Sequence, residues 1–171
     1  MLPKSTTFLI ACSLTAALGS SGCYGFSGGG GLPSHMNTAF VPPVENDTPR
    51  FTLTERMTQS LLDAVRSKLG LQLAAEGEAD LIVTARITRY SDVALNFDAR
   101  EGEATQVFQR RITITAAVEI FDTQLEEMYW SSQSVTGVGE YAPETEQEEV
   151  GETIALENLT QKIVDGAQSD W

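Results

Sequence analysis

The chain has 171 residues, and its 11 Lys and Arg stand against 24 Asp and Glu, so the formal net charge is −13. Such an acidic balance disfavours nucleic-acid binding, because neutralising phosphates requires a basic surface. The length suits one domain with a modest hydrophobic core.

The first 22 residues have the layout of a secretory signal peptide. Lys4 precedes an apolar run over residues 8–18, and small residues follow at 19–22. The run is shorter than the roughly 20 apolar residues that span a bilayer. Cys23 comes next, and this arrangement resembles a bacterial lipoprotein signal, in which the cysteine thiol carries the lipid. We therefore predict lipid attachment at Cys23. Acylation at Cys12, or secretion with a free Cys23, are the alternative interpretations.

Removal of residues 1–22 leaves 149 residues, a net charge of −14 and one cysteine, so no intramolecular disulfide is expected. Residues 23–35 contain four consecutive glycines and predict a flexible tether between the lipid anchor and a folded domain over 36–171. The single histidine, His35, falls in this tether, where it would make a poor general base.

The first part of the domain predicts a short strand and a helix. Residues 37–41 have extended character, and two prolines end the segment before a turn over 45–49. Apolar residues then recur at steps of three and four over 53–69, which indicates an amphipathic helix. Thr52 and Glu55 have the spacing of a capping box, and Gly70 is a plausible stop.

The second part predicts three strands and a last helix. Residues alternate in polarity over 81–88 and again over 108–120, with a hairpin loop from Phe97 to Thr105 between them. A third strand covers 128–136 and is closed by the glycines at 137 and 139, and a helix with Ala155, Leu159 and Ile163 in one seam follows. The order β-α-β-β-β-α predicts an α+β two-layer sandwich. Its two helices would pack on one face of a roughly four-stranded, mainly antiparallel sheet.

The residues do not predict catalysis, a metal site or a cofactor. No serine or cysteine has a suitable base partner, and no Cys/His cluster has zinc spacing. The glutamates between 140 and 157 lack the Asp-rich loop of a calcium site, so a solvated acidic face is the favoured interpretation over a cation-binding module or a periplasmic enzyme.

Two short motifs and the order of elements resemble the LptE family. The motifs are Cys-Tyr-Gly-Phe-Ser-Gly from Cys23, and Val-Pro-Pro-Val-Glu-Asn-Asp-Thr from Val41. The resemblance implies a lipopolysaccharide-assembly lipoprotein on the periplasmic side of the outer membrane, acting as plug or chaperone of the β-barrel LptD. Tyr24 rather than Asp after Cys23 agrees with outer-membrane sorting. The alternative is an auxiliary lipoprotein of another lipid-trafficking system, such as an ABC transporter.

Four arginines of the middle strands are the candidate contacts for lipopolysaccharide or for a protein partner. Because the mature chain is strongly acidic, long-range attraction to lipid phosphates is disfavoured and any contact must be local. The competing interpretation pairs the arginines with acids in and near the hairpin, such as Asp92 and Asp98. The polar face of the sheet and the hairpin around Phe97 are the predicted partner surfaces. The candidates are Arg86, Arg89, Arg110 and Arg111, and the polar face is Thr84, Arg86, Thr88, Thr113 and Thr115.

Overall fold

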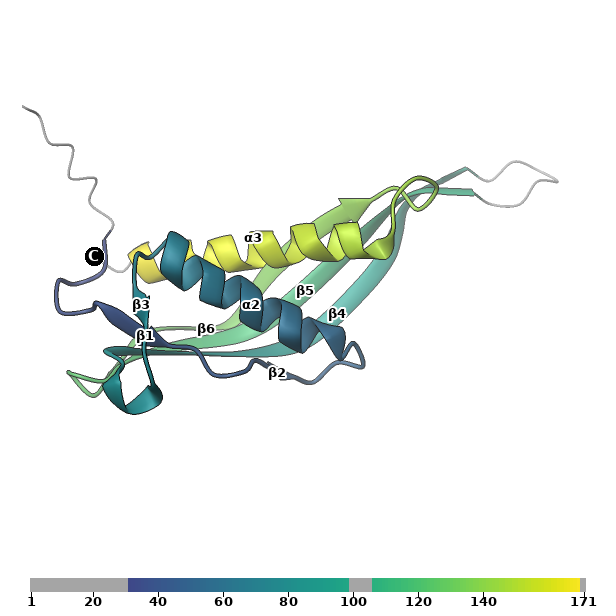
Figure 1. Ribbon diagram of the computed structural model, residues 1–171. Helices are drawn as coiled ribbons and strands as arrows, with labels where there is room; N and C mark the ends of the chain where they lie inside the picture. Colours follow the sequence, from purple (N-terminus) through teal and green to yellow (C-terminus); the bar gives the residue numbers. More distant parts are fainter. Residues whose placement is uncertain (1–30, 99–105, 170–171) are drawn as a thin grey trace, which may run out of the picture.

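Three long strands and two helices make up most of the structure, a computed structural model that describes residues 31–98 and 106–169 (Figure 1). The elements in chain order are β1 (Thr38–Phe40), β2 (Glu45–Asn46), α2 (Thr52–Ser67), β3 (Gln72–Leu73), the 3₁₀ turn η1 (Glu76–Glu78), β4 (Leu81–Asp98), β5 (Gln106–Asp122), β6 (Glu127–Tyr141) and α3 (Glu148–Ser169). The predicted α+β class is confirmed.

The sheet is mixed, with strand order β3-β1-β4-β5-β6. The long strands β4, β5 and β6 are antiparallel neighbours. On the other side of β4, β1 pairs in parallel near Leu81 and β2 pairs in parallel near Arg86. The predicted count of about four strands is wrong, because β2 and β3 have two residues each and are too short to leave a periodic pattern.

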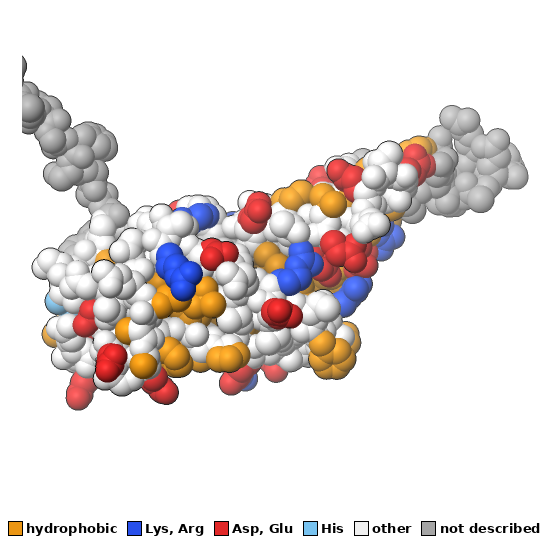
Figure 2. All heavy atoms as spheres, in the orientation of Figure 1, with side chains coloured by type: hydrophobic (Ala, Val, Ile, Leu, Met, Phe, Trp, Pro, Cys, Tyr) orange, Lys and Arg blue, Asp and Glu red, His pale blue; other side chains and the backbone are white. Residues whose placement is uncertain are grey.

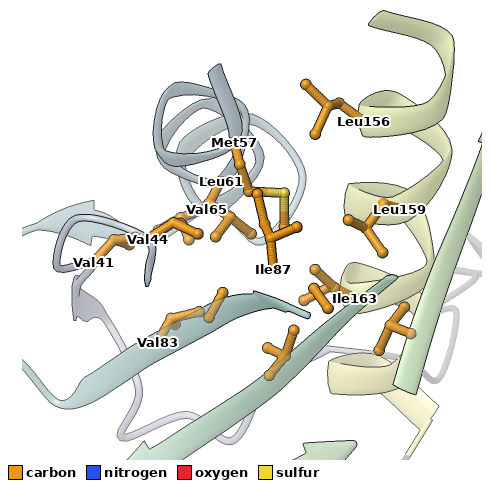
Figure 3. Packing of buried hydrophobic residues seen from close by; sticks show 14 of the residues in the cluster. Val41, Val44, Met57, Leu61, Val65, Val83, Ile87, Leu156, Leu159 and Ile163 are labelled. Atoms are coloured by element: carbon orange, nitrogen blue, oxygen red, sulfur yellow. The ribbon is translucent and has the colours of Figure 1, made fainter. Parts of the chain in front are cut away.

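Both helices cover the same face of the sheet and form the core with it (Figures 1 and 3). Met57, Leu61 and Val65 of α2 point toward Ile87 of β4, and Leu159 of α3 approaches from the other side (Figure 3). Each of these side chains is at most 2% exposed. The apolar seams predicted from the 3.6-residue period are therefore confirmed, and their burial supplies the main stabilisation of the fold.

A β-bulge in β4 changes which residues face the helices. Up to Ile87 the odd-numbered residues are buried, but the register with β5 shifts between Ile87 and Arg89. Beyond the shift, Tyr90 and Asp92 stand opposite the buried Ile114 and Ile112. The extra residue thus turns Arg89 to the outer face and brings a polar pair to the helix side.

The ends of α2 differ in part from the prediction. The capping box is wrong, because Thr52 is already helical and Phe51, the N-cap residue, makes no side-chain cap bond. The stop at Gly70 is confirmed: this residue has φ +71, and the Leu71 N–H beyond it donates to the Val65 carbonyl at 3.1 Å. Only glycine adopts that backbone conformation at low cost.

The glycines at 137 and 139 lie inside β6 and do not close it, so the predicted strand end is wrong. β6 continues to Tyr141 because α3 packs directly on these residues. A Cβ at Gly139 would lie 2.0 Å from the Gly151 carbonyl oxygen, and one at Gly137 equally close to that of Ala155. The glycines therefore allow the helix backbone to approach the strand.

The β4–β5 hairpin projects past the helices at one end of the molecule (Figure 1). The loop predicted from Phe97 is wrong at its start, because β4 runs to Asp98, and residues 99–105 lie outside the described residues. Phe108 begins the alternating run over 108–120, and its place in that run predicts the buried face. It is instead 44% exposed, since it lies beyond the helix layer. Residue 31 and the end of α3 lie at the opposite end of the molecule (Figure 1).

Candidate functional site

The face of the sheet opposite the helices carries polar side chains and no helix packs on it within the described ranges. As predicted, Thr84, Arg86 and Thr88 point to solvent from β4, and Thr113 and Thr115 lie half-buried beside them on β5. Thr115 and Thr136 place their hydroxyl oxygens 3.4 Å apart across β5 and β6. A polar face of this kind suits a protein partner or water better than an apolar ligand.

A groove of about 570 Å³ opens where the segment between β1 and β2 runs past this face. Its lining includes Pro42, Pro43 and three carboxylates, against a single arginine. The acidic balance disfavours a lipid phosphate in the groove. The charged lining residues are Glu45, Asp47, Arg86 and Glu119.

Two of the candidate arginines on the outer face are already paired with glutamates. Arg86 Nη2 lies 2.7 Å from Oε2 of Glu45, the residue opposite it on β2. Arg111 Nη2 lies 2.6 Å from Oε1 of Glu140, the residue opposite it on β6. Both pairs are well exposed and contribute little to stability.

Arg110 belongs to a separate cluster on the helix side, at the base of the projecting hairpin. Its Nε lies 3.0 Å from both carboxylate oxygens of Asp92, and the Tyr141 hydroxyl donates to the same carboxylate at 3.1 Å. The hydrogen bond to Asp92 raises the pKa of the Arg110 guanidinium. Burial, together with the Asp92 charge, raises the pKa of Tyr141. The predicted pairing of a strand arginine with Asp92 is therefore confirmed here.

Arg89 differs from the other three candidates. It is exposed on the outer face opposite Thr115, and within residues 31–98 and 106–169 it has no ion-pair partner. The structure thus separates the four arginines into three that hold a carboxylate and one that does not. It does not bring the four together into one basic cluster.

A buried ionic contact between the helices was missed by the sequence analysis. Glu152 of α3 is 4% exposed and bonds to the Arg56 guanidinium of α2, which also donates to the Thr153 hydroxyl at 2.6 Å. The sequence gives one indication of this contact: Glu152 lies three positions before Ala155 and so falls on the apolar side of the last helix.

A second contact lies toward the helix N-termini. Tyr90 donates to Glu148 Oε1 at 2.5 Å, and Arg50 bonds to the same carboxylate while its guanidinium carbon lies 4.9 Å from the centre of the Tyr90 ring. Burial, with the hydrogen bond to Glu148, raises the pKa of Tyr90. These bonds join β4, the segment just before α2 and the start of α3 at the base of the hairpin.

The segment before β1 is held to the domain by two aspartates, so the expectation of a flexible His35 is wrong. His35 Nε2 lies 2.7 Å from Oδ2 of Asp122, whose side chain is 1% exposed. Burial alone would raise the pKa of Asp122, but hydrogen bonds from His35 and from the N–H groups of Leu125 and Gln124 lower it. The contact spans 87 positions of the sequence and leaves no local pattern.

Asp80 accepts four hydrogen bonds, three of them from the start of β1 and the residue before it. Its carboxylate accepts the N–H groups of Asn37 and Thr38 and the Thr38 hydroxyl, each at 2.9 Å, and the Gln124 side-chain amide at 2.6 Å. These bonds lower the pKa of Asp80 from 3.8 to about 2. The two aspartates therefore fix where the chain enters the sheet.

Acid is expected to weaken this attachment. A carboxyl group with a lowered folded-state pKa stabilises the fold above its unfolded value near 3.8, and loses that contribution as pH falls toward 2. An Asp80→Asn variant should therefore be about 1 kcal/mol less stable than the parent at pH 7, after screening by water. Thermal melts at pH 7 and pH 2.5 measure the difference, which should shrink in acid. A difference that stays constant over this range would contradict the assignment.

The charged side chains visible on the helix side of the molecule are mixed in sign (Figure 2). Within the described ranges, no three His, Cys, Asp or Glu side chains come together as metal ligands, and neither helix has the length and apolarity to cross a bilayer. Cys23 and the predicted signal peptide lie outside the described residues. Fold and surface together define a small α+β protein with one uncovered, polar sheet face and a projecting hairpin.

Comparison with known families assigns this α+β domain. The model of the LptE lipopolysaccharide-assembly family matches residues 36–166, a range that spans β1 to β6, α2 and all but the last three residues of α3. The chain belongs to this family, whose members are non-enzymatic envelope lipoproteins. No curated protein matches the sequence.

Solved structures share the fold at low sequence identity. A hypothetical protein of Chlamydia trachomatis is 12% identical with a TM-score of 0.54, over 75% of this chain and 94% of that one. An uncharacterized lipoprotein B of Nitrosomonas europaea is 11% identical with a TM-score of 0.54, over 81% and 84%. A Xanthomonas campestris protein is 12% identical with a TM-score of 0.53, over 80% and 86%. At such identities the likeness concerns the fold alone.

Proposed function

We propose that the protein is an outer-membrane lipoprotein that supports an LptD-like β-barrel, as its plug or chaperone, in the transport of lipopolysaccharide to the cell surface. The observation that carries the proposal is the match of the LptE family over residues 36–166, which covers nearly the whole folded domain. In this proposal residues 1–22 are a signal peptide, Cys23 carries the lipid, and the domain lies on the periplasmic side of the membrane.

The arrangement of the domain supports a partner-holding role. Residue 31, next to the proposed tether, lies at one end of the molecule and the hairpin at the other, so the hairpin points away from the anchored end (Figure 1). The outer sheet face between them is polar and uncovered within the described part of the chain. A polar face fits the hydrophilic lumen of a barrel, where interior-facing residues are polar.

The candidate arginines are proposed to serve the protein partner and not lipopolysaccharide phosphates. Arg86, Arg110 and Arg111 already hold a carboxylate each, so a phosphate would have to displace it. The strongly negative chain also repels an anionic lipid at long range.

Depletion of the protein in its native cells tests this function. Surface lipopolysaccharide and folded barrel are both expected to fall, and detergent extraction followed by affinity purification should recover the barrel with the protein. Normal lipopolysaccharide at the surface after depletion, with recovery of a transporter in place of a barrel, would support the alternative of an auxiliary transport lipoprotein.

The lipid anchor has its own prediction. Replacing Cys23 by serine should remove the acyl mass from the N-terminal peptide and release the protein from the membrane fraction, because a serine hydroxyl cannot take the place of the thiol that carries the lipid. Fractionation and mass spectrometry of the native protein measure both effects. Cys12→Ser is the matched control, since it should leave the acylated terminus intact; loss of the lipid in that variant instead would move the anchor to Cys12.

A further inference from the structure

The sheet has two long edges, one formed by β6 and one by the second half of β4, and the rest of the described chain covers only the first. On β6, side chains of α3 cover the edge: Asn158 donates to the Val138 carbonyl and Lys162 to the Thr136 carbonyl, both at 2.7 Å. Capping of this kind keeps an edge strand from pairing with another chain.

The other edge belongs to β4, and it is covered only in its first half. β1 pairs with β4 at Leu81 and Ile82, and β2 pairs at Arg86 and Ile87. Beyond Ile87, no strand within the described ranges lies on that side of β4, although the strand continues to Asp98. The open part from Arg89 onward is about 30 Å long at roughly 3.3 Å per residue.

The register shows which backbone groups the open edge presents. The Thr136 carbonyl faces away from β5, so its partner Thr115 directs its backbone groups toward β4. Arg89, opposite Thr115, therefore bonds to β5. By alternation, the N–H and C=O groups of Tyr90, Asp92 and Ala94 point to the open edge. Among these, the Asp92 carbonyl receives a long 3.5 Å contact from Arg110.

The chain itself shows how a strand binds to this edge. β2 lies parallel to β4 and places Glu45 directly opposite Arg86, with an ion pair of 2.7 Å. Arg89 follows three positions later on the same outer face and has no carboxylate partner in the described part of the chain. A strand that continued along the edge would carry the matching carboxylate.

We propose that the edge of β4 from Arg89 to Ala94 is a strand-addition site for an extended segment of a partner protein, with an acidic residue of that segment opposite Arg89. Main-chain hydrogen bonds give such a contact its affinity, and the ion pair sets its register. A second copy of this chain is a poor occupant, because two molecules of net charge −14 after signal removal repel each other. The inference does not depend on the partner being a barrel.

The test uses a photoreactive benzoyl-phenylalanine at Val93 of the full-length protein in its native cells. Val93 is 47% exposed and lies on the outer face within this edge. The same probe at Ser134, an exposed position of the capped β6 edge, is the positional control. We expect an adduct at Val93 at least ten times stronger than at Ser134, with the bound peptide belonging to another protein and containing Asp or Glu.

A second substitution tests whether the backbone is used. Ala94→Pro removes an N–H directed at the open edge and leaves the ladder to β5 intact, a position at which proline is tolerated. It should reduce the Val93 adduct at least ten-fold, whereas Ala94→Ser, which keeps the N–H, should not. Arg89→Glu should also reduce the Val93 adduct several-fold. If Ala94→Pro lowers the melting temperature, Arg89→Glu alone is the test.

The outcomes separate this inference from the proposed function. An adduct that survives both Ala94→Pro and Arg89→Glu, an adduct within this chain or between two copies, or no adduct at Val93 would each overturn strand addition. Strand addition by a protein that is not a barrel would support the inference and contradict the plug function. If a barrel is purified with the protein in an amount that neither Ala94→Pro nor Arg89→Glu changes, that result would support the plug function and contradict strand addition.

Discussion

Replacement of Gly139 by alanine is expected to lower the free energy of unfolding by about 3 kcal/mol and the melting temperature by about 10 °C. The added Cβ would lie 2.0 Å from the Gly151 carbonyl oxygen and 2.7 Å from the Ala155 backbone nitrogen. Both obstacles are helix backbone, which cannot rotate away as a side chain can. The helix α3 would have to move off β6 and open the core around Leu159.

The control for this prediction is Gly77→Ala in the 3₁₀ turn η1. A Cβ there meets nothing within 4 Å, and the residue is exposed. Its melting temperature should match that of the parent. Urea unfolding followed by circular dichroism gives the free energy for both variants. A Gly139→Ala protein as stable as Gly77→Ala would show that α3 does not lie as close to β6 as the structure has it.

This close contact explains why the sequence predicted the helices better than the last strand. Regular apolar spacing is a local signal, so Leu53, Met57 and Leu61 identified the buried side of α2 correctly. A glycine inside a strand has the same local appearance as a glycine in a turn, and Gly137 was therefore placed at a strand end. The difference lies in Ala155, a residue of another element.

In the candidate site, too, local features could be predicted from the sequence and contacts between distant segments could not. Alternation placed Arg86 and Arg111 on the polar face correctly, because side-chain direction in a strand has a period of two. Their partners were not predictable. Glu45 reaches Arg86 through a parallel pairing of two residues, and the open edge at Arg89 exists because β2 ends one residue after Glu45. Lengths of short strands are set by tertiary packing and not by propensity.

The ionic contacts also give the acidic composition a structural meaning. A net charge of −13 suggests that most acidic side chains are exposed to solvent, and the glutamates between 140 and 157 were interpreted as a solvated acidic face. Two of them, Glu148 and Glu152, instead bond to Arg50 and Arg56, and so tie α3 to the segment before α2 and to α2 itself. Most of the described arginines thus form ion pairs within the chain, which is consistent with a partner surface that does not depend on a basic patch. These are Arg50, Arg56, Arg86, Arg110 and Arg111.

The Arg56–Glu152 contact carries the second large prediction. Arg56→Met should lower the free energy of unfolding by about 3 kcal/mol, because it leaves the Glu152 carboxylate, 4% exposed, without its counter-charge. Arg56 itself is 29% exposed, so the methionine fits without overpacking.

The double variant Arg56→Met with Glu152→Met distinguishes a lost attraction from a stranded charge. Removing both groups should restore stability to within about 1 kcal/mol of the parent, since replacing a buried ion pair by apolar side chains is often nearly neutral. Urea unfolding of the parent, both single variants and the double variant forms a complete cycle. A double variant as unstable as Arg56→Met would mean that the guanidinium acts through its bond to the Thr153 hydroxyl and not through the glutamate.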